Sequence, residues 1–243
     1  MAPPSTNDML DRSLGQLARN IPGATAVFHE VGLDFCCGGN KSLRTAAETN
    51  NINPQQLEQR LLNLVQGTQL PATETMPLPK LIDYILENYH AVHRLDLPEL
   101  IRLAEKVERV HGNKEECPTG LTAHLTHMAQ ELEAHMQKEE NILFPMIKQG
   151  SGSIVLGPIT VMRHEHDDHG AALRELERLT NNIKPPFGAC NTWRALYLGL
   201  DKLKQELMEH IHLENNVLFS KLEEDFHRIQ AQGKTSCCGG CGG

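Results

Sequence analysis

Apolar residues recur at helical spacing along most of the chain, in four long stretches and several short ones. The long stretches cover about 79–111, 121–148, 158–182 and 191–232. Short polar connections join them, and we find no stretch with the convincing pattern of a strand. Four long helices joined in this way pack as an antiparallel bundle. The pattern therefore predicts an all-α protein with a four-helix bundle at 79–231.

The first 68 residues follow a different pattern, in which short helical stretches are separated by glycine, proline and polar residues. They predict a small helical head domain, 1–68, with a modest apolar content. Residues 69–78 contain prolines and threonines without apolar periodicity, which predicts a linker between separable units. Residues 232–243 are rich in cysteine and glycine and are predicted to form a flexible tail.

Composition and charge narrow the class of protein. The formal net charge of −8 argues against binding to nucleic acid or to an anionic membrane, because phosphate surfaces need an excess of lysine and arginine. No apolar run approaches the roughly 20 residues that a membrane helix needs, and the N-terminus lacks an apolar signal core. The cysteines include two adjacent pairs, which are poor disulfide partners. These features predict a cytoplasmic protein with reduced thiols.

The bundle sequence repeats itself, and the repeat carries polar residues in matched positions. In each half, a histidine on one helix is followed about 45 residues later by a His-x3-Glu motif on the next helix. Both motifs continue as x-Asn, then Ile or Val, then Leu-Phe. The repeated set is His90, His135, Glu139, His166, His210 and Glu214.

The repeated residues have the chemistry of metal ligands. Positions i and i+4 of a helix lie on one face, so the histidine and glutamate of each motif can reach one point. Apolar residues share their stripes, which turns them toward the interior, where an unpaired carboxylate costs several kcal/mol. Four imidazoles and two carboxylates there predict two metal ions bridged by Glu139 and Glu214. The ligand types favour a non-haem di-iron centre over structural zinc. Such a centre would suit ferrous iron and could bind oxygen or nitric oxide.

Longer motifs resemble a known family. The head motif Asp-Phe-Cys-Cys-Gly-Gly at 34–39 and the bundle segments 143–150 and 213–219 are similar to the repair of iron centres family, which has a hemerythrin-like four-helix domain. The resemblance spans about 13–222. It implies that the six repeated residues bind two iron ions, with Glu139 and Glu214 as bridges. It also implies repair of iron–sulfur clusters damaged by oxidative or nitrosative stress, with nitric oxide bound or reduced at the same centre.

Three further glutamates lie beside the predicted centre in the sequence. Glu131 and Glu206 precede the His-x3-Glu motifs by one helical turn, and Glu165 directly precedes His166. They are predicted to orient ligands or to form a polar path to solvent, with a simple surface position as the alternative.

Four extra histidines accompany the repeated set. His93 and His169 follow the two upstream histidines by three residues. For these two, a hydrogen bond to a ligand, a role as alternative ligand and a surface position all stay open. His164 and His212 are predicted to lie at the surface.

The cysteines allow two readings. Cys36 and Cys37 are predicted to be a redox or metal-handling thiol pair, and the alternative is a tight turn with buried small residues. The tail repeats the motif with Cys237, Cys238 and Cys241, either as an unstructured end or as a thiol arm that handles iron.

Two classes of function follow from these features. The first is a repair protein that supplies iron to damaged iron–sulfur proteins, with nitric oxide reductase-type activity if it is an enzyme. The second is a hemerythrin-like module that binds or senses nitric oxide or oxygen without delivering iron. The thiol-bearing head favours the first. The sequence leaves the oligomeric state open, a homodimer included.

Overall fold

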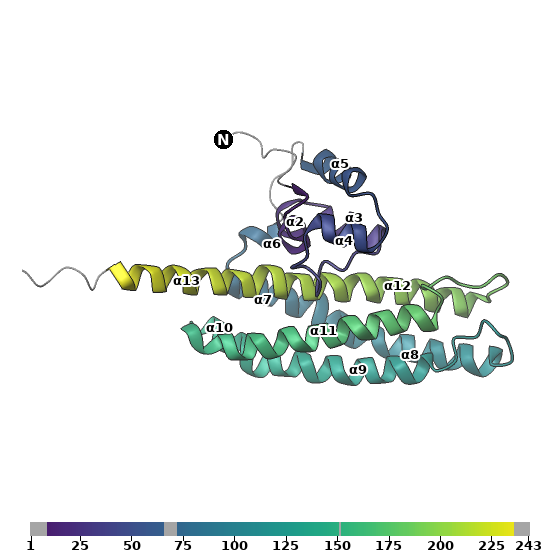
Figure 1. The fold of residues 1–243 in the computed structure, drawn as a ribbon. Coiled ribbons are helices and arrows are strands. Elements are labelled where there is room, and N and C mark those ends of the chain that lie inside the picture. The colour runs from purple at the N-terminus through teal and green to yellow at the C-terminus, as the bar shows by residue number, and fades with distance from the viewer. Residues whose placement is uncertain (1–8, 66–71, 151, 236–243) are drawn as a thin grey trace, which may run out of the picture.

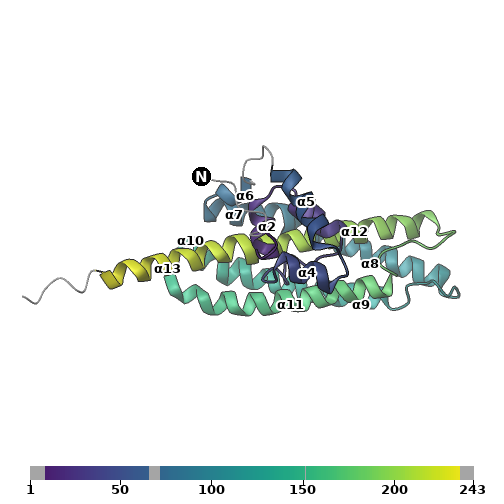
Figure 2. The same cartoon turned by 45° about the horizontal axis from the view of Figure 1, so that its top comes forward.

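The computed structural model describes residues 9–65, 72–150 and 152–235, and in these ranges it contains helices and no strands. Four long helical rods lie side by side, and a group of short helices sits on one side of them (Figures 1 and 2). The prediction of an all-α protein with a four-helix bundle and a small helical head is confirmed. Across the described residues, every helix is too short or too polar to span a lipid bilayer.

Each rod of the bundle is built from consecutive helical segments, three of which are short π-helical turns named η1, η2 and η4. The segments are α7 (Leu78–Ile85), η1 (Leu86–His90) and α8 (Ala91–His111); α9 (Leu121–Lys138), η2 (Glu139–Leu143) and α10 (Phe144–Lys148); η3 (Gly152–Val155) and α11 (Leu156–Leu179); and α12 (Asn191–His212), η4 (Leu213–Leu218) and α13 (Phe219–Thr235). α8 packs beside α9 and α12, and α11 packs beside the same two helices, which closes a four-membered ring.

The interior of the bundle consists of two apolar clusters. One cluster, which includes Leu100, Leu125 and Trp193, fills the half that carries the loops 112–120 and 180–190. The other includes Ile82 and Phe144 and fills the half toward α10. The six repeated histidines and glutamates belong to neither apolar cluster, and each of these residues is at most 1% exposed. A fully buried polar layer therefore interrupts the apolar core.

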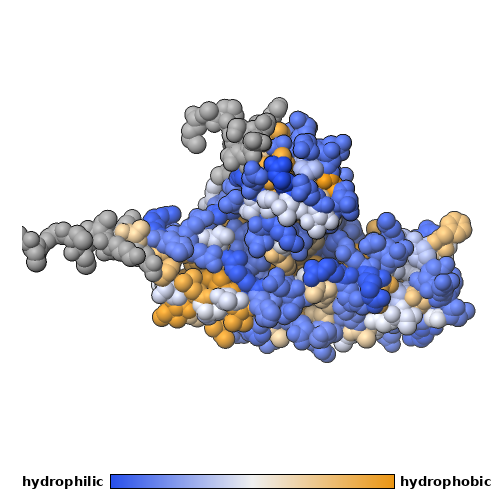
Figure 3. Space-filling view, in the orientation of Figure 1, coloured by the Kyte–Doolittle hydropathy of each residue, from blue (hydrophilic) through white to orange (hydrophobic). Residues whose placement is uncertain are grey.

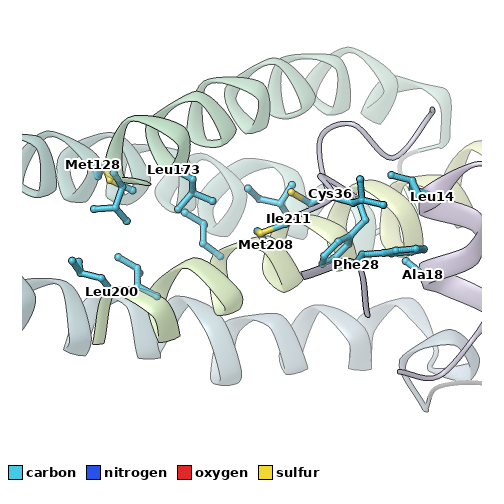
Figure 4. Close-up of a cluster of buried hydrophobic side chains, with 14 of the residues drawn as sticks. Leu14, Ala18, Phe28, Cys36, Met128, Leu173, Leu200, Met208 and Ile211 are labelled. Atoms are coloured by element: carbon cyan, nitrogen blue, oxygen red, sulfur yellow. The ribbon is translucent and has the colours of Figure 1, made fainter. Parts of the chain in front are cut away.

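The head comprises α2 (Leu14–Asn20), α3 (Ala24–Glu30), α4 (Leu43–Thr49) and α5 (Pro54–Val65). The Ser42 hydroxyl accepts a hydrogen bond from the Thr45 amide and caps α4. Figure 4 shows apolar side chains of the head, among them Phe28, in the same buried cluster as Met208 and Ile211 of α12. In Figure 3 the visible surface of the head is largely hydrophilic, so its apolar side chains face its own interior and the bundle.

The head and the bundle share one apolar core, so the two predicted domains are in direct contact. Part of the predicted linker is helical, since α6 (Ala72–Thr75) lies within it. Glu74 of α6 pairs with Arg19 of the head, and Arg19 also pairs with Glu224 of α13. The domain boundaries stay a prediction, with the head docked on the bundle. The cysteines of the predicted tail lie outside the described residues.

Asn216 in η4 holds the head on the bundle. Its side-chain amide donates to the backbone carbonyl of Phe35 at 3.2 Å and to His212 Nδ1 at 3.0 Å. The Asn216 side chain also lies against Gly15 of α2, where a Cβ atom would be only 2.3 Å from Asn216 Oδ1. Gly15 is thus needed for the close approach of α2 to the bundle.

Substitution of Gly15 by alanine should weaken head docking. The new methyl group would force Asn216 to rotate away, which would break both of its hydrogen bonds. We expect a loss of about 1–3 kcal/mol in the free energy of unfolding, measured by urea titration. Gly157→Ala is the matched control, because no atom lies within 4 Å of the added Cβ. Equal stabilities of the two variants would contradict this role of Gly15.

Candidate metal centre

The six repeated residues, named here the His₄Glu₂ cluster, converge in the polar layer of the bundle. Their donor atoms form two groups, each with all atoms within 4.8 Å of one another. One group is His90, His210, Glu139 and Glu214, and the other is His135, His166, Glu139 and Glu214. The structure thus brings together every residue of the repeated set, and each group takes its two histidines from different halves of the repeat.

Both glutamates lie between the two groups. Glu139 Oε2 is 3.4 Å from His90 Nε2 and 3.5 Å from His135 Nε2. Glu214 divides its oxygens, with Oε1 3.2 Å from His210 Nε2 and Oε2 3.1 Å from His166 Nε2. Each carboxylate can therefore face two cations at once.

Three of the four rods change to π-helical geometry where they meet the cluster. His90 ends η1, Glu139 begins η2 and Glu214 lies in η4. A π turn holds more residues than an α turn and is frequent at functional sites. The sequence pattern does not predict these turns, because the apolar periodicity on either side is ordinary α-helical.

Three of the four histidines have their Nδ1 atom held by a partner outside the cluster. His90 Nδ1 donates to Glu140 Oε1 at 2.8 Å, and His166 Nδ1 donates to Asn215 Oδ1 at 2.9 Å. His135 Nδ1 donates to Glu165 at 2.8 Å. These bonds place the proton on Nδ1 and turn Nε2 toward the cluster, as histidine ligands of metals require.

Glu165 contacts His135, and its role in orienting that ligand stays a prediction, whereas Glu140 and Asn215 are not predicted from the sequence. The repeat places Glu140 and Asn215 at matched positions, from which their role could have been predicted. Each directly follows a glutamate of the cluster and receives a hydrogen bond from the upstream histidine of its own half. The matched positions differ in charge, so one histidine faces a carboxylate and the other an amide.

The remaining predicted glutamates do not contact the cluster through a hydrogen bond or an ion pair among the described residues. Glu206 pairs with Lys202 at 3.5 Å. Glu131 is exposed and lines a cavity of about 550 Å³ together with Glu165 and His169. A polar path through this cavity stays a prediction, with Glu165 as its contact to the cluster.

The extra histidines divide into buried and exposed ones. His93 and His169 are buried, with ring centroids 5.3 Å from His210 and 5.0 Å from His135 respectively. His164 is exposed, as predicted. The surface prediction for His212 is wrong. This ring is 4% exposed because it faces the head and packs edge-on against Phe35 at 5.6 Å.

The donor atoms of the cluster fit a pair of cations. His90 Nε2 and His210 Nε2 are 3.1 Å apart, and His135 Nε2 and His166 Nε2 are also 3.1 Å apart. Both carboxylate oxygens of Glu139 are buried without a hydrogen-bond partner, which is costly unless another group neutralises them. Converging ring nitrogens and unpaired carboxylate oxygens are the arrangement that a metal ion satisfies, and imidazole with carboxylate suits iron.

Burial and contacts within the cluster raise the pKa values of some of its residues and lower those of others. Burial opposes charge on His90 and His166, but the neighbouring carboxylates raise the pKa of His90 to about 10 and that of His166 to about 9. Burial lowers the pKa of His135 to about 2 and also lowers the pKa of His210. Burial, followed by the charge of Glu214, raises the pKa of Glu139 to about 8. Protons therefore occupy part of the cluster at neutral pH when no cation does.

Comparison with known proteins agrees with this geometry. Residues 81–222 match the family described as Hemerythrin HHE cation binding domain, and residues 10–65 match the Domain of Unknown function (DUF542). Three relatives are each called "Iron-sulfur cluster repair protein YtfE". The relative from Pectobacterium atrosepticum is 51% identical and that from Dickeya chrysanthemi 53%, each over 87% of this chain and 96% of the relative. That from Citrobacter koseri is 49% identical over the same shares.

The chain belongs to the YtfE family. The family resemblance drawn from the sequence motifs is thereby confirmed. The family matches cover both the head and the bundle.

The thiol loop of the head meets the cluster at His166. Cys37 Sγ donates to the backbone carbonyl of His166 at 3.1 Å. The Cys36 carbonyl accepts from the Asn215 amide at 3.1 Å, and Asn215 Oδ1 accepts from His166 Nδ1. Two hydrogen-bonded connections thus join the predicted thiol pair to one histidine of the cluster.

Proposed function

We propose that the His₄Glu₂ cluster binds two iron ions as a non-haem di-iron centre, with Glu139 and Glu214 as bridging ligands. The observation that carries this proposal is that both glutamates belong to both groups of donor atoms. Each iron position would be held by two histidines and the two shared carboxylates. Iron bound there would supply exchangeable ferrous ions and one-electron redox chemistry.

We further propose that this protein repairs damaged iron–sulfur clusters by supplying iron to client proteins in the cytoplasm. The printed name of the relatives supports the repair role. The donor set supports iron supply, because two carboxylates balance only half of the charge of two ferrous ions, and such a site holds iron less tightly than a carboxylate-rich one. Oxidative or nitrosative damage to clusters would create the demand for this iron.

A second function, binding or reduction of nitric oxide, or binding of oxygen, would use the same centre. It is favoured by the four donor residues at each position, since coordination positions not taken by protein can accept a small ligand. The cluster residues would then bind iron and, because they are buried, exclude bulk water from it. Glu140, Glu165 and Asn215 would hold the histidine ligands in orientation.

Labelled iron distinguishes the two functions. The full-length protein is loaded with an iron isotope and mixed, under anaerobic conditions, with an iron–sulfur enzyme damaged by nitric oxide or peroxide. We expect the repaired enzyme to contain the isotope, and His135→Ala to lower the rate of repair by roughly 10-fold or more. Glu115→Ala is a control for the iron-supply step, because its side chain is exposed in the loop 112–120 and lies outside both donor groups. Repair without transfer of the isotope would exclude iron supply and favour the second function.

A further inference from the structure

A second set of metal-ligand side chains lies in the head, at the turn that faces the bundle. The thiols of Cys36 and Cys37 and a carboxylate oxygen of Asp34 all lie within 4.8 Å of one another. The two Sγ atoms are 3.6 Å apart, and Cys36 Sγ is 3.4 Å from Asp34 Oδ1. We propose that Asp34, Cys36 and Cys37 form a third metal site, which takes one divalent ion with affinity for thiolate, such as ferrous iron or zinc.

The backbone of the turn organises these three donors before any ion arrives. Asp34 Oδ1 accepts hydrogen bonds from the amides of Cys37 at 2.9 Å and Gly38 at 3.0 Å. At Gly38 an added Cβ would be 2.8 Å from the Asp34 carbonyl oxygen, so the tight turn requires glycine there. The turn therefore holds both thiols side by side next to the carboxylate, and little conformational entropy is lost when an ion binds.

Two cavities give access to the thiols from outside the protein. One has a volume of about 420 Å³ and the other about 730 Å³, and Cys36, Cys37 and Asn40 line both. Asp167 lines both cavities too and offers a further carboxylate beside the site. The His₄Glu₂ cluster, in contrast, is fully buried, so an ion from solvent meets the thiol turn more easily than the cluster.

The donor chemistry determines the class of ion. Two thiolates balance the charge of a divalent cation and the carboxylate adds one further negative charge, while thiolate selects zinc, ferrous iron and similar borderline ions over magnesium or calcium. Binding replaces two S–H bonds by two bonds from sulfur to the metal, and the two protons leave to solvent without any change of oxidation state. Three protein donors leave a coordination position for water or an exchanging ligand.

The third site is separate from the proposed di-iron centre, because the two sets share no side-chain donor. They are neighbours all the same, since Cys37 Sγ contacts the carbonyl of His166. A thiol site in this place would hold an ion within the head, adjacent to the cluster.

Cobalt(II) is a direct probe, because thiolate bound to cobalt gives an intense charge-transfer band that histidine and carboxylate ligands do not give. The parent protein is the full chain with Cys237→Ser, Cys238→Ser and Cys241→Ser, reduced with a phosphine and loaded with ferrous iron. We expect the band to saturate at about one cobalt per chain. Cys36→Ser or Cys37→Ser should remove at least about half of its intensity, and the double variant should remove it fully.

Asp34→Asn tests the carboxylate without removing a thiol. The asparagine oxygen can still accept the two backbone hydrogen bonds, so the turn is preserved while its charge is lost. We expect cobalt to bind roughly 10-fold more weakly, with the same band at saturation.

Cys190→Ser is the matched control, because this thiol pairs with His111 outside the site and its loss should leave the band unchanged. A parent protein without the band, or a band that survives in the Cys36/Cys37 double variant, would overturn the proposal. Circular dichroism verifies that each variant folds, and Asp34→Asn decides the question if the double variant does not. Because the band reports only thiolate, the result is independent of whether the bundle holds two irons.

Discussion

Glu214→Ala and Glu139→Ala are each expected to remove most of the iron from both positions of the centre. Each glutamate belongs to both donor groups, so one substitution takes a ligand from two ions. A cluster histidine belongs to only one group. In a Cys36→Ser/Cys37→Ser background, which removes the proposed thiol site, we therefore expect about two irons per chain with the centre intact, less than about one in either glutamate variant, and about one in His135→Ala.

The controls for this prediction come from residues near the cluster. His93→Ala should keep nearly all the iron, because His93 is in neither donor group although it is buried beside His210. Iron is measured by elemental analysis after anaerobic loading, with circular dichroism to verify the fold. A larger loss in His93→Ala than in Glu214→Ala would show that the ligand set is assigned wrongly.

Iron loading of the two positions of the centre at pH 7 is expected to release about three protons per chain, measured in the Cys36→Ser/Cys37→Ser background so that the thiols contribute none. In the metal-free protein the pKa values of His90, His166 and Glu139 are raised to about 10, 9 and 8, so all three groups carry a proton at pH 7. The lowered pKa values of His135, His210 and Glu214 mean that these groups carry no additional proton that a cation must displace. Cations must displace the three protons, so the iron affinity rises with pH until the pH passes the three raised pKa values.

Calorimetric titration in buffers with different heats of ionisation measures this count. The number of released protons should decrease as the pH is raised through about 8, because Glu139 then loses its proton before iron binds. His93→Ala should leave the count unchanged, because burial lowers the pKa of His93 to about 2. Release of fewer than about one proton from the unaltered protein would contradict the protonation pattern.

The repeat in the sequence was sufficient to predict the members of the cluster but not their partners. Helical spacing places His135 and Glu139 on one face of α9 and its continuation, and this is a local property. It does not say which histidine of another helix stands opposite. The ring order of the bundle sets His90 against His210 and His135 against His166, because α8 neighbours α12 and α9 neighbours α11.

Residues at the contact between head and bundle were the least predictable. His212 has the sequence context of a surface histidine on a polar side of α12, yet it is buried because the head covers that side. Its pKa is lowered to about 4 by this burial and by Arg19. Asn215 likewise serves two parts of the fold, since its oxygen accepts from His166 while its amide reaches the Cys36 carbonyl.

The amino-acid sequence alone determined that this chain is helical, that its last four long helices form a bundle, and that six matched histidines and glutamates point into that bundle. These properties follow from periodicity and spacing within single helices, which are local. Only the tertiary structure decided where the π turns lie and which histidines pair across the two halves. It also decided which residues accept hydrogen bonds from histidine Nδ1 and that the thiol turn contacts His166. Those depend on contacts between residues far apart in the chain, which the spacing of residues along one helix does not encode.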